Sequence, residues 1–365
     1  MSEWQTFCLK DLGKIVGGAT PPTNNPKNYG NKIAWITPKD LSTLQGRYIK
    51  KGSRSISRLG FKSCSCALLP KHAILFSSRA PIGYVAIAEK RLCTNQGFKS
   101  IIPNKKIYFE FLYYLLKYHK DNISNIGGGT TFKEVSGATL GLFEVKIPPT
   151  YYEQQKIART LSILDQKIEN NHKINELLHT LAYKIYEYYF KYKPKNAKLE
   201  QIIIENPKSN IMVKNAQKTQ DKYPFFTSGD NILSYPKSII DGRNCFLNTG
   251  GNAGIKFYVG KASYSTDTWC ICTNEFSDYL YLLLSSIKNH INQSFFQGTS
   301  LKHLQKNLLK KYPIYMPSAH EIKKFNQIIM PLLTLISINT RTSKKLEQIR
   351  DFLLPLLLKQ QVKPQ

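Results

Sequence analysis

The residue types that could do chemistry occur in this sequence without the spacing that catalysis needs. An adenine methyltransferase holds its flipped base with a loop of Asp, Asn or Ser followed by two prolines and an aromatic residue. The two Pro-Pro pairs stand instead in TPPT at 20–23 and IPPT at 147–150. The phosphate-binding pattern G-x-x-x-x-G-K-S/T and the zinc pattern H-E-x-x-H are both missing. The sequence therefore indicates no methyltransferase, ATPase or metalloprotease centre.

Metal chemistry has equally weak candidates. A metal-dependent nuclease needs clustered carboxylates near a lysine, and the nearest approach is the stretch EVK at 144–146. Its alternation is that of an ordinary strand ending before Pro148. The C-x-C pairs Cys64–Cys66 and Cys270–Cys272 have apolar neighbours, and no C-x-x-C occurs. We interpret these cysteines as buried thiols and expect no metal or other cofactor in this chain.

Charge is the strongest functional signal. The 365 residues include 52 Lys and Arg against 24 Asp and Glu, a formal net charge of +28. An excess of this size favours a polyanionic partner, because a compact chain would otherwise repel itself. The length allows two domains with their own cores. The sequence has no apolar run long enough to span a membrane, and its start lacks a signal-peptide pattern, so we expect a cytoplasmic protein.

An internal repeat indicates that the chain is a duplicated unit. The stretch GGTTFKEVSGATLGLFEVKIPP begins at 128, and a cruder copy, QGTSLKHLQKNLLKKYPIYMPS, begins at 297. Both run from a Gly-rich turn through an apolar strand to a proline before a predicted helix. An ungapped offset of 169 residues pairs Gly129 with Gly298, Thr130 with Thr299, Lys133 with Lys302, Pro148 with Pro317, and Asn170 with Asn339.

Each copy is followed by a predicted long helix. Residues 153–189 keep a heptad pattern without Pro or Gly, and a similar pattern covers 320–358, where Pro355 is expected to end or kink the helix. Asparagines in the middle of the apolar seam are typical of a helix pair with a fixed register. The seam of the first helix comprises Ile157, Leu161, Leu164, Ile168, Asn171, Asn175, Leu178, Ala182, Ile185 and Tyr189.

These patterns predict an α/β fold with two-part organisation. Short strands and one internal helix, at 107–119 and 278–291 respectively, form each of two globular domains. The predicted parts are 1–150 (first domain), 151–192 (first long helix), 193–318 (second domain) and 319–365 (second long helix). The simplest packing sets the two long helices antiparallel with a domain at each end, related by pseudo-twofold symmetry. Two basic domains at a fixed spacing suit a split DNA site.

Several motifs, in order, resemble one family. They are EWQTFCLKDLGKIVGGATPP, YGNKIAWITPKDLS, ALLPKHAILFSSRAPIGYVAIAE, TNQGF and GGGTTFKEVSGATLGLFEVKIPPTYYEQQKIARTLSILDQKIE. Together they resemble the specificity (S) subunit of type I restriction-modification systems, HsdS. The resemblance is strong over 1–190 and weaker over 199–365, where EQQKIA has become EIKKFN.

The resemblance implies both fold and role. It implies two target-recognition domains joined by two long antiparallel conserved helices. It implies a subunit without catalytic chemistry that recognises a bipartite double-stranded DNA sequence and docks two methyltransferase (M) subunits. S-adenosylmethionine, used to methylate adenine, and ATP and Mg are then expected on partner subunits, which include the restriction (R) subunits.

Basic residues in turns are the candidates for DNA contact, because phosphates are bound mainly by Lys, Arg and small polar groups. The stretch GRYIKKGSRSISRLGFK, at 46–62, supplies most candidates of the first domain. The predicted DNA-binding residues are Lys39, Arg47, Lys50, Lys51, Arg54, Arg58, Lys62, Arg79, Thr130, Lys133, Lys214, Lys218, Lys222, Arg243, Lys256, Thr299 and Lys302.

The exposed sides of the two long helices are the candidates for partner binding. The predicted residues are Glu153, Gln154, Gln155, Lys156, Arg159, Glu321 and Lys323. Two other functions stay open on the sequence alone. One is a single-chain nuclease or DNA methyltransferase with a divergent active site, and the other is a fused-dimer RNA-binding or scaffold protein.

Overall fold

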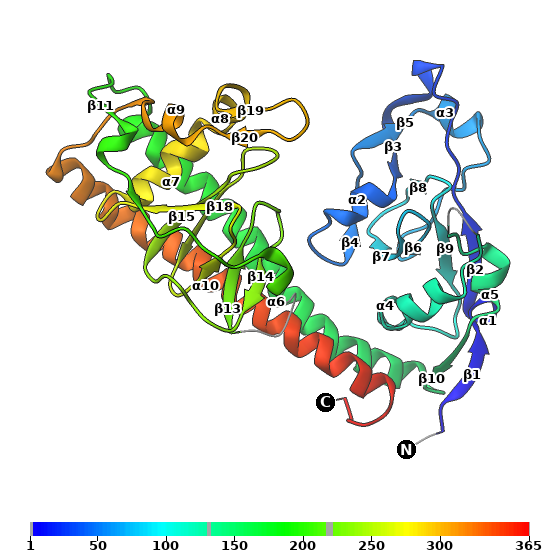
Figure 1. Ribbon diagram of the computed structural model, residues 1–365. Helices are drawn as coiled ribbons and strands as arrows, with labels where there is room; N and C mark the ends of the chain where they lie inside the picture. The colour runs from blue at the N-terminus through cyan, green and yellow to red at the C-terminus, as the bar shows by residue number, and fades with distance from the viewer. Residues whose placement is uncertain (1–2, 130–132, 217–221, 365) are drawn as a thin grey trace. The chain divides into compact units, whose positions relative to one another are not determined.

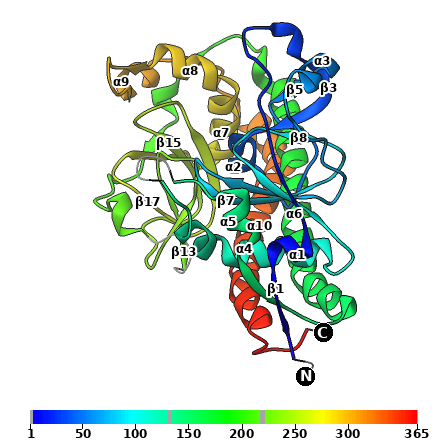
Figure 2. The same ribbon diagram turned by 90° about the vertical axis from the view of Figure 1, so that its right-hand side faces the viewer.

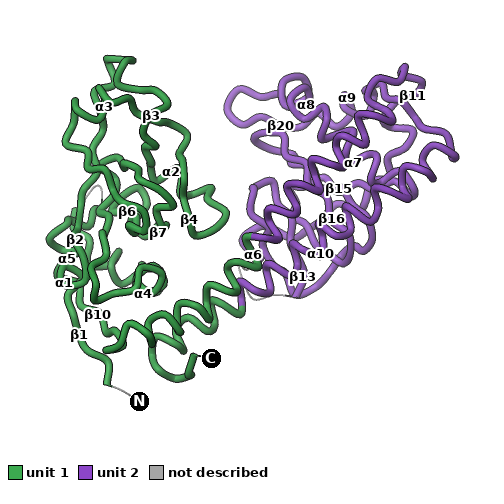
Figure 3. The backbone as a smooth tube through the Cα atoms, turned by 180° about the vertical axis from the view of Figure 1, so that it is seen from behind, with its two compact units in different colours: residues 1–169, 349–365 green, residues 170–348 purple. Residues whose placement is uncertain are grey.

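The computed structural model describes residues 3–129, 133–216 and 222–364, which divide into two compact units (Figure 3). Unit 1 comprises residues 1–169 and 349–365, and unit 2 comprises residues 170–348. Both boundaries fall inside long helices, α6 (Tyr151–Tyr186) and α10 (Ala319–Leu358). Each unit therefore contains one end of both helices, whereas the sequence analysis set the helices apart from the domains.

Unit 1 is built on a five-stranded sheet of order β2-β9-β6-β7-β4, with a three-stranded sheet, β5-β3-β8, beside it (Figure 1). The central strand β6 is buried along its whole length, and α4 packs on β7 and β6 with Phe111, Leu112 and Leu115 buried. The elements are β1 (Gln5–Cys8), α1 (Leu9–Leu12), β2 (Gly13–Gly17), η1 (Pro26–Asn28), β3 (Tyr29–Ile36), α2 (Pro38–Ser42), β4 (Tyr48–Ile49), β5 (Arg54–Ile56), α3 (Arg58–Lys62), β6 (Ile74–Ser78), β7 (Ile82–Ala88), β8 (Cys93–Thr94), β9 (Lys99–Pro103), α4 (Phe109–Asn125), α5 (Gly137–Gly141) and β10 (Glu144–Ile147).

Unit 2 repeats this plan with a four-stranded sheet, β12-β18-β15-β16, and a three-stranded sheet, β14-β13-β17. The single helix predicted at 278–291 is divided into α7 and α8, because Ile287 leaves the helical conformation with φ −106° and ψ 14°. The elements are η2 (Glu187–Lys191), β11 (Ala197–Lys198), η3 (Leu199–Gln201), β12 (Ile204–Glu205), η4 (Val213–Asn215), β13 (Tyr223–Phe226), β14 (Leu233–Tyr235), β15 (Arg243–Asn248), β16 (Ile255–Val259), β17 (Ser263–Tyr264), β18 (Thr268–Cys272), α7 (Ser277–Ser286), α8 (Lys288–Ser294), β19 (Phe296–Gln297), β20 (His303–Leu304), α9 (Lys306–Lys310) and β21 (Pro313–Ile314).

The structure corrects the register of the repeat by one residue in the helices. Strands β6 and β15 begin 169 residues apart, as do β9 and β18, but α6 and α10 begin 168 apart. Both helices start with the same capping box, in which Ser or Thr bonds the N–H of a glutamate three residues on: Thr150 with Glu153, and Ser318 with Glu321. Asn171, and not Asn170, is therefore the counterpart of Asn339.

The two long helices are antiparallel, as predicted (Figure 2). In unit 2, Asn171 donates to Ser343 Oγ at 3.1 Å, and Asn339 donates to Asn175 Oδ1 at 2.9 Å. With the 168-residue offset these two pairs are equivalent, so the polar layer itself obeys the pseudo-twofold relation. Because each asparagine in the seam meets a polar partner only in this alignment, the layer fixes the helix register.

Of the two outcomes expected for Pro355, an end or a kink of the helix, the structure contradicts the first. The helix continues to Leu358, and Leu354, Leu357 and Leu358 are buried in the core of unit 1. This burial stabilises the last helical turn and offsets the loss of the backbone hydrogen bond that Pro355 cannot donate.

Four of the cysteines, Cys66, Cys93, Cys245 and Cys270, are buried. Each C-x-C pair has one buried thiol, Cys66 or Cys270, and one partly exposed thiol, Cys64 or Cys272, so the interpretation of buried thiols holds for one member of each pair. Among the helices of the described residues, none is long and apolar enough to cross a membrane.

We predict that the start of α10 weakens at acidic pH. Hydrogen bonds from Ser318 and Tyr315 lower the pKa of Glu321 from 4.5 to about 2. A carboxyl with a depressed folded-state pKa stabilises the fold above its unfolded-state value, and that contribution is lost as pH falls from about 4.5 towards 2. In urea titrations over this range, Glu321→Gln should lose less stability than the wild type. Equal losses in both proteins would contradict the assignment.

Candidate nucleic-acid interface

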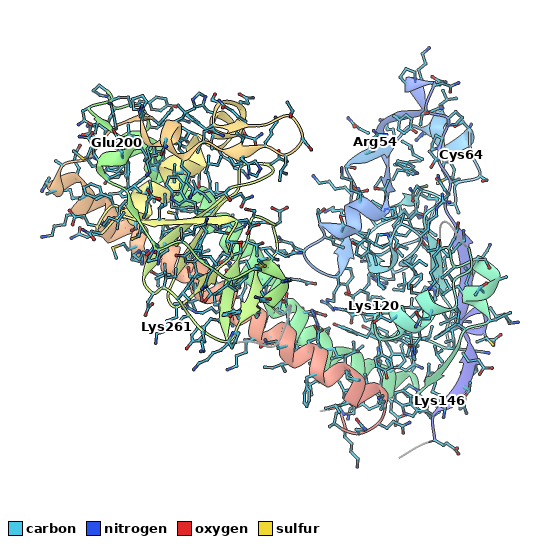
Figure 4. All side chains as sticks on the ribbon, viewed as in Figure 1. Arg54, Cys64, Lys120, Lys146, Glu200 and Lys261 are labelled. Carbon is cyan, nitrogen blue, oxygen red and sulfur yellow. The ribbon has the colours of Figure 1, made fainter. Side chains whose placement is uncertain are left out.

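Six of the seven cations predicted for the first stretch of unit 1 are exposed. Lys39 lies on α2, while the other five follow each other from the β4–β5 turn to the end of α3, with Arg54 labelled in Figure 4. The exposed set is Lys39, Lys50, Lys51, Arg54, Arg58 and Lys62. We call this set the basic segment.

Asp40 holds the turn that carries Lys50 and Lys51. Its carboxylate accepts the N–H of Ser53 at 2.7 Å and both the N–H and the hydroxyl of Thr37 at 2.7 Å. Burial acts to raise the pKa of Asp40, but these hydrogen bonds lower it more, so the net shift is downward. The acid is thus satisfied by the turn itself, and the turn presents its lysines outward.

A second group of candidates lies at two adjoining loops of unit 1, the loop after β6 that carries Arg79 and the segment 133–135, where the Val135 N–H donates to the Ser78 carbonyl at 3.0 Å. We call these two loops, and their counterparts in unit 2, the paired loops. Glu134 forms ion pairs with both Arg79, at 3.4 Å, and Lys99, at 3.3 Å. The charge of Arg79 is therefore only partly neutralised. Lys133 is exposed beside Glu134, and Thr130 lies outside the described residues.

Unit 2 brings the corresponding loops together. The Gly251 N–H donates to the Lys302 carbonyl at 2.9 Å, and the Leu304 N–H donates to the Thr249 carbonyl at 3.0 Å. Gly251 has a φ of +78°, a conformation that favours glycine, and no atom lies near the position that a Cβ would occupy. The hairpin turn 249–254 is therefore joined to the loop 297–303 that carries the exposed Thr299 and Lys302. Lys214 and Lys222 are also exposed, while Lys218 lies outside the described residues.

Lys256 has a structural role, which removes it from the candidate interface. Its ammonium donates to the carbonyls of Thr227 and Gly229, both at 2.6 Å, and to Asn248 Oδ1 at 3.2 Å. Burial lowers its pKa. The lysine therefore ties two loops of unit 2 together.

Arg47 is also withdrawn from the interface, because its side chain is only 3% exposed. Its guanidinium lies 2.9 Å from Glu110 on α4 and 3.1 Å from Glu169 on α6. Burial by itself lowers the pKa of Arg47, but Tyr114 and the two glutamates raise it more, so the arginine stays charged. We call Arg47, Glu110 and Glu169 the first clamp.

Further hydrogen bonds extend the first clamp to α10. Asp165 on α6 lies 4.0 Å from Arg47 and accepts from the Tyr114 hydroxyl at 2.6 Å and from Arg350 at 2.7 Å. Since Arg350 belongs to α10, one buried polar network joins the first domain to both helices within unit 1.

Arg243, like Lys256 and Arg47, was predicted to contact DNA but makes internal contacts instead. It forms a cluster in unit 2 that is equivalent to the first clamp. It binds both carboxylate oxygens of Asp278 on α7, and on α10 it donates to Thr334 Oγ1 at 2.9 Å and to the Met330 carbonyl at 3.2 Å. Burial raises the pKa of Asp278, although the arginine opposes that shift. We call Arg243, Asp278 and Thr334 the second clamp.

The two clamps correspond although their arginines do not align in sequence. Glu110 and Asp278 are each the second residue of the internal helix of their domain, α4 and α7. Arg47 precedes the edge strand β4, whereas Arg243 begins the inner strand β15. Each arginine also reaches the long helix that follows its own domain in the chain. The same attachment has therefore been built from two different positions of the repeat.

Gln154, predicted for partner binding, is 1% exposed and links the start of α6 to neighbouring segments of unit 1. Its side chain accepts the Tyr108 N–H at 2.7 Å and donates to the carbonyls of Lys106 and Pro148. Ile322 takes its place in α10 and is also buried, so the change from EQQKIA to EIKKFN replaces one internal contact by another.

The other predicted partner-binding residues lie on the helix starts. Gln155, Arg159 and Lys323 are exposed. Glu153 and Glu321 belong to the capping boxes, and the Lys156 ammonium lies 5.1 Å from the Tyr152 ring centre.

The sequence analysis missed an exposed apolar stripe on the helices. In unit 2 its most exposed members are Leu177 (71%) and Tyr188 (85%). The stripe comprises Ile174, Leu177 and Leu181 on α6, Tyr188 on η2, and Ile328, Leu335 and Ile338 on α10. The sequence signal for this stripe is a second series of apolar residues, each of which stands one position before a seam residue.

Helix geometry puts both halves of this stripe on the same side of the pair. Stepping back one residue rotates a position by about 100° around the helix axis. In an antiparallel pair the two rotations carry both series to the same face. Residues one step after the seam, such as Tyr186 on α6 and Ser337 on α10, contact the domain of unit 2 instead. The stripe therefore faces away from that domain.

Comparison with known proteins decides the family. The model for the type I restriction modification DNA specificity domain matches residues 1–180 and again residues 195–348. The chain belongs to the type I restriction-modification specificity-subunit family. This membership assigns it DNA specificity as a non-catalytic subunit, as the resemblance implied.

Relatives and solved structures support the same family. The type I restriction enzyme MjaIX specificity subunit of Methanocaldococcus jannaschii is 32% identical over 98% of this chain and 93% of that protein. A putative type I specificity subunit of Mycoplasma genitalium is 23% identical over 84% of this chain and 80% of its own length. The crystal structure of the type I restriction-modification S subunit from M. genitalium has the same fold, with a TM-score of 0.63, 17% identity, and 97% and 96% of the two chains covered. The predicted fold class is thus confirmed.

We predict that the clamps contribute to stability, while the basic segment does not. Removing one member of a buried ion pair costs about 3–5 kcal/mol, because the remaining charges lose their partner. Arg47→Ala and Arg243→Ala should each lower the free energy of unfolding by about that amount in urea titrations. Exposed Lys50→Ala is the control and should change it by less than about 0.5 kcal/mol. Arg47→Ala with wild-type stability would mean that Arg47 is not buried as described.

Proposed function

We propose that this specificity subunit binds a bipartite double-stranded DNA site and holds two methyltransferase subunits, thereby directing adenine methylation and, with restriction subunits, cleavage. The observation that carries the proposal is the double match of the DNA specificity model, which follows the internal repeat. S-adenosylmethionine, ATP and Mg belong to the partner subunits in this proposal. The assembly acts in the cytoplasm, where the host DNA is.

Phosphate contact falls to the exposed cations. The basic segment combines six exposed cations with a turn fixed by Asp40, so the backbone that carries Lys50 and Lys51 is already ordered before DNA binds. Lys214, Lys222 and Lys302 supply exposed positive charge in unit 2. A preordered surface loses less conformational entropy on binding. Arg47, Arg243 and Lys256 take no part, since their charges are already used inside the protein.

The paired loops provide the same phosphate contact in both domains. The Gly-Thr turns and the lysines three residues later, Lys133 and Lys302, are retained across the repeat. Two half-sites of different sequence share only their sugar-phosphate backbone. Features that both domains retain are therefore suited to the backbone, and features that differ are suited to the bases. Thr130, Thr299 and Arg79 are assigned to the same phosphate contact in this proposal.

The apolar stripe is the proposed docking surface for methyltransferase subunits. Large exposed apolar side chains at helical spacing bind an amphipathic partner helix well. Gln155, Arg159 and Lys323, which are exposed near the starts of the two helices, are kept as separate candidates for partner contact in this proposal.

The function is tested by reconstituting the chain with methyltransferase subunits and mapping methylated adenines on genomic DNA by long-read sequencing. We expect one motif made of two short half-sites separated by a fixed gap. Methylation without a shared motif, or methylation by the chain alone, would contradict the proposal.

We predict that the basic segment sets the salt dependence of DNA binding. Replacing Lys50, Lys51, Arg54 and Arg58 with alanine should weaken binding and reduce the slope of log K against log salt by up to about 0.9 for each lost phosphate contact. Fluorescence anisotropy titrations between low and moderate salt measure this slope. A slope equal to that of the wild type would remove the segment from the interface.

We predict that charge on the apolar stripe prevents assembly. Leu177→Asp with Leu181→Asp should abolish co-purification with the methyltransferase subunit, because a carboxylate would be buried without a partner. Thr180→Asp adds a single carboxylate at a neighbouring exposed position and should leave assembly intact. Assembly that survives the double substitution would show that the subunits dock elsewhere.

A further inference from the structure

We propose that the two arginine clamps determine which gap length between the half-sites the protein accepts. This inference rests on the proposed function, because it assumes a bipartite site. It goes further by assigning gap selectivity to buried residues that touch no DNA.

Each clamp has one arm in the recognition domain and one arm on a long helix. In unit 1, Arg47 joins Glu110 on α4 to Glu169 on α6, and its own backbone N–H also donates to Glu169 at 2.9 Å. In unit 2, Arg243 joins Asp278 on α7 to Thr334 on α10. The guanidinium is planar and its donors have fixed directions, so each bridge specifies an angle as well as a contact.

Burial makes these bridges intolerant of sliding. The Arg47 side chain is 3% exposed and that of Asp278 is 2% exposed. If the domain turned on its helix, a charge would leave its partner inside the protein, where water cannot replace the lost contact. Other polar contacts also join each domain to the long helices, such as Tyr114 with Asp165 in unit 1 and Val259 with Ser337 in unit 2. In the clamps, however, an arginine charge has partners on both the domain and the helix, and we assign to them the main resistance to rotation of each domain on α6 and α10.

The geometry of DNA turns such rotation into gap selectivity. Each added base pair moves a half-site by about 3.4 Å along the duplex and turns it by about 35° around the axis. Each long helix contributes residues to both units, so both domains are attached to the same two helices. A domain that cannot rotate on these helices cannot follow a half-site that has moved by one base pair.

The contact of each arginine with its long helix can be weakened while its contact with the domain is kept. Glu169→Gln keeps the shape of the side chain and removes its charge, while leaving the pair of Arg47 with Glu110. Thr334→Val removes the acceptor for Arg243 and keeps the volume of the side chain. Glu176→Gln on α6 changes an exposed carboxylate and serves as the matched control.

The experiment uses the full chain assembled with its methyltransferase subunits and a plasmid library in which the two half-sites are separated by gaps of varied length. Adenine methylation is read by long-read sequencing after a fixed time. Thermal unfolding measurements check that each variant is folded. The same change in gap selectivity is expected for both variants, so the test can be made with either one if the other does not fold.

We expect Glu169→Gln and Thr334→Val to raise methylation at gaps one base pair longer or shorter, relative to the preferred gap, by about fivefold, which corresponds to about 1 kcal/mol. The half-site bases should not change, and Glu176→Gln should match the wild type. Wild-type gap selectivity in both variants, or altered half-site bases, would overturn the assignment. A wild-type protein that methylates no split motif would instead refute the proposed function itself.

Discussion

A buried guanidinium must be matched by carboxylates or carbonyls, and this constraint organises both halves of the molecule. Arginine cannot lose its proton in a protein, so burying it without partners would cost many kcal/mol. Arg47 and Arg243 meet the requirement by bridging an acid of their domain to a long helix. These bridges add directional polar contacts to the apolar cores through which each domain packs on the long helices.

The long helices obey a similar constraint at their centre. Asn171 and Asn175 would be unsatisfied in an apolar seam, but each meets a polar residue of α10 in one register only. The two pairs are related by the 168-residue repeat, which makes the polar layer the local centre of the pseudo-twofold relation. Hydrophobic packing supplies most of the stability of such a pair, and the polar layer supplies its alignment.

Much of the fold and the sign of the surface charge could be predicted from the sequence. Heptad spacing predicted both long helices because it is a local signal, and the repeat supported the second of them. Burial is not local, and it decided which cations are available. Lys50 and Arg47 stand three residues apart in one basic stretch, yet Arg47 is enclosed by acids that follow 63 and 122 residues later. Gln154 is a similar case, since its partners include Lys106 and Tyr108. The exposed stripe beginning at Ile174 was hidden because its apolar residues resemble core residues until the packing is known.

In the proposed function, exposed cations contact DNA and the buried ones do not. The most direct test is to acetylate lysines in the assembled complex with and without its cognate duplex and to measure each site by mass spectrometry. Lys50, Lys51 and Lys62 should lose reactivity when the duplex is added, whereas the exposed Lys173 on α6 should react equally in both states. Unchanged reactivity of all three lysines on duplex binding would contradict the account.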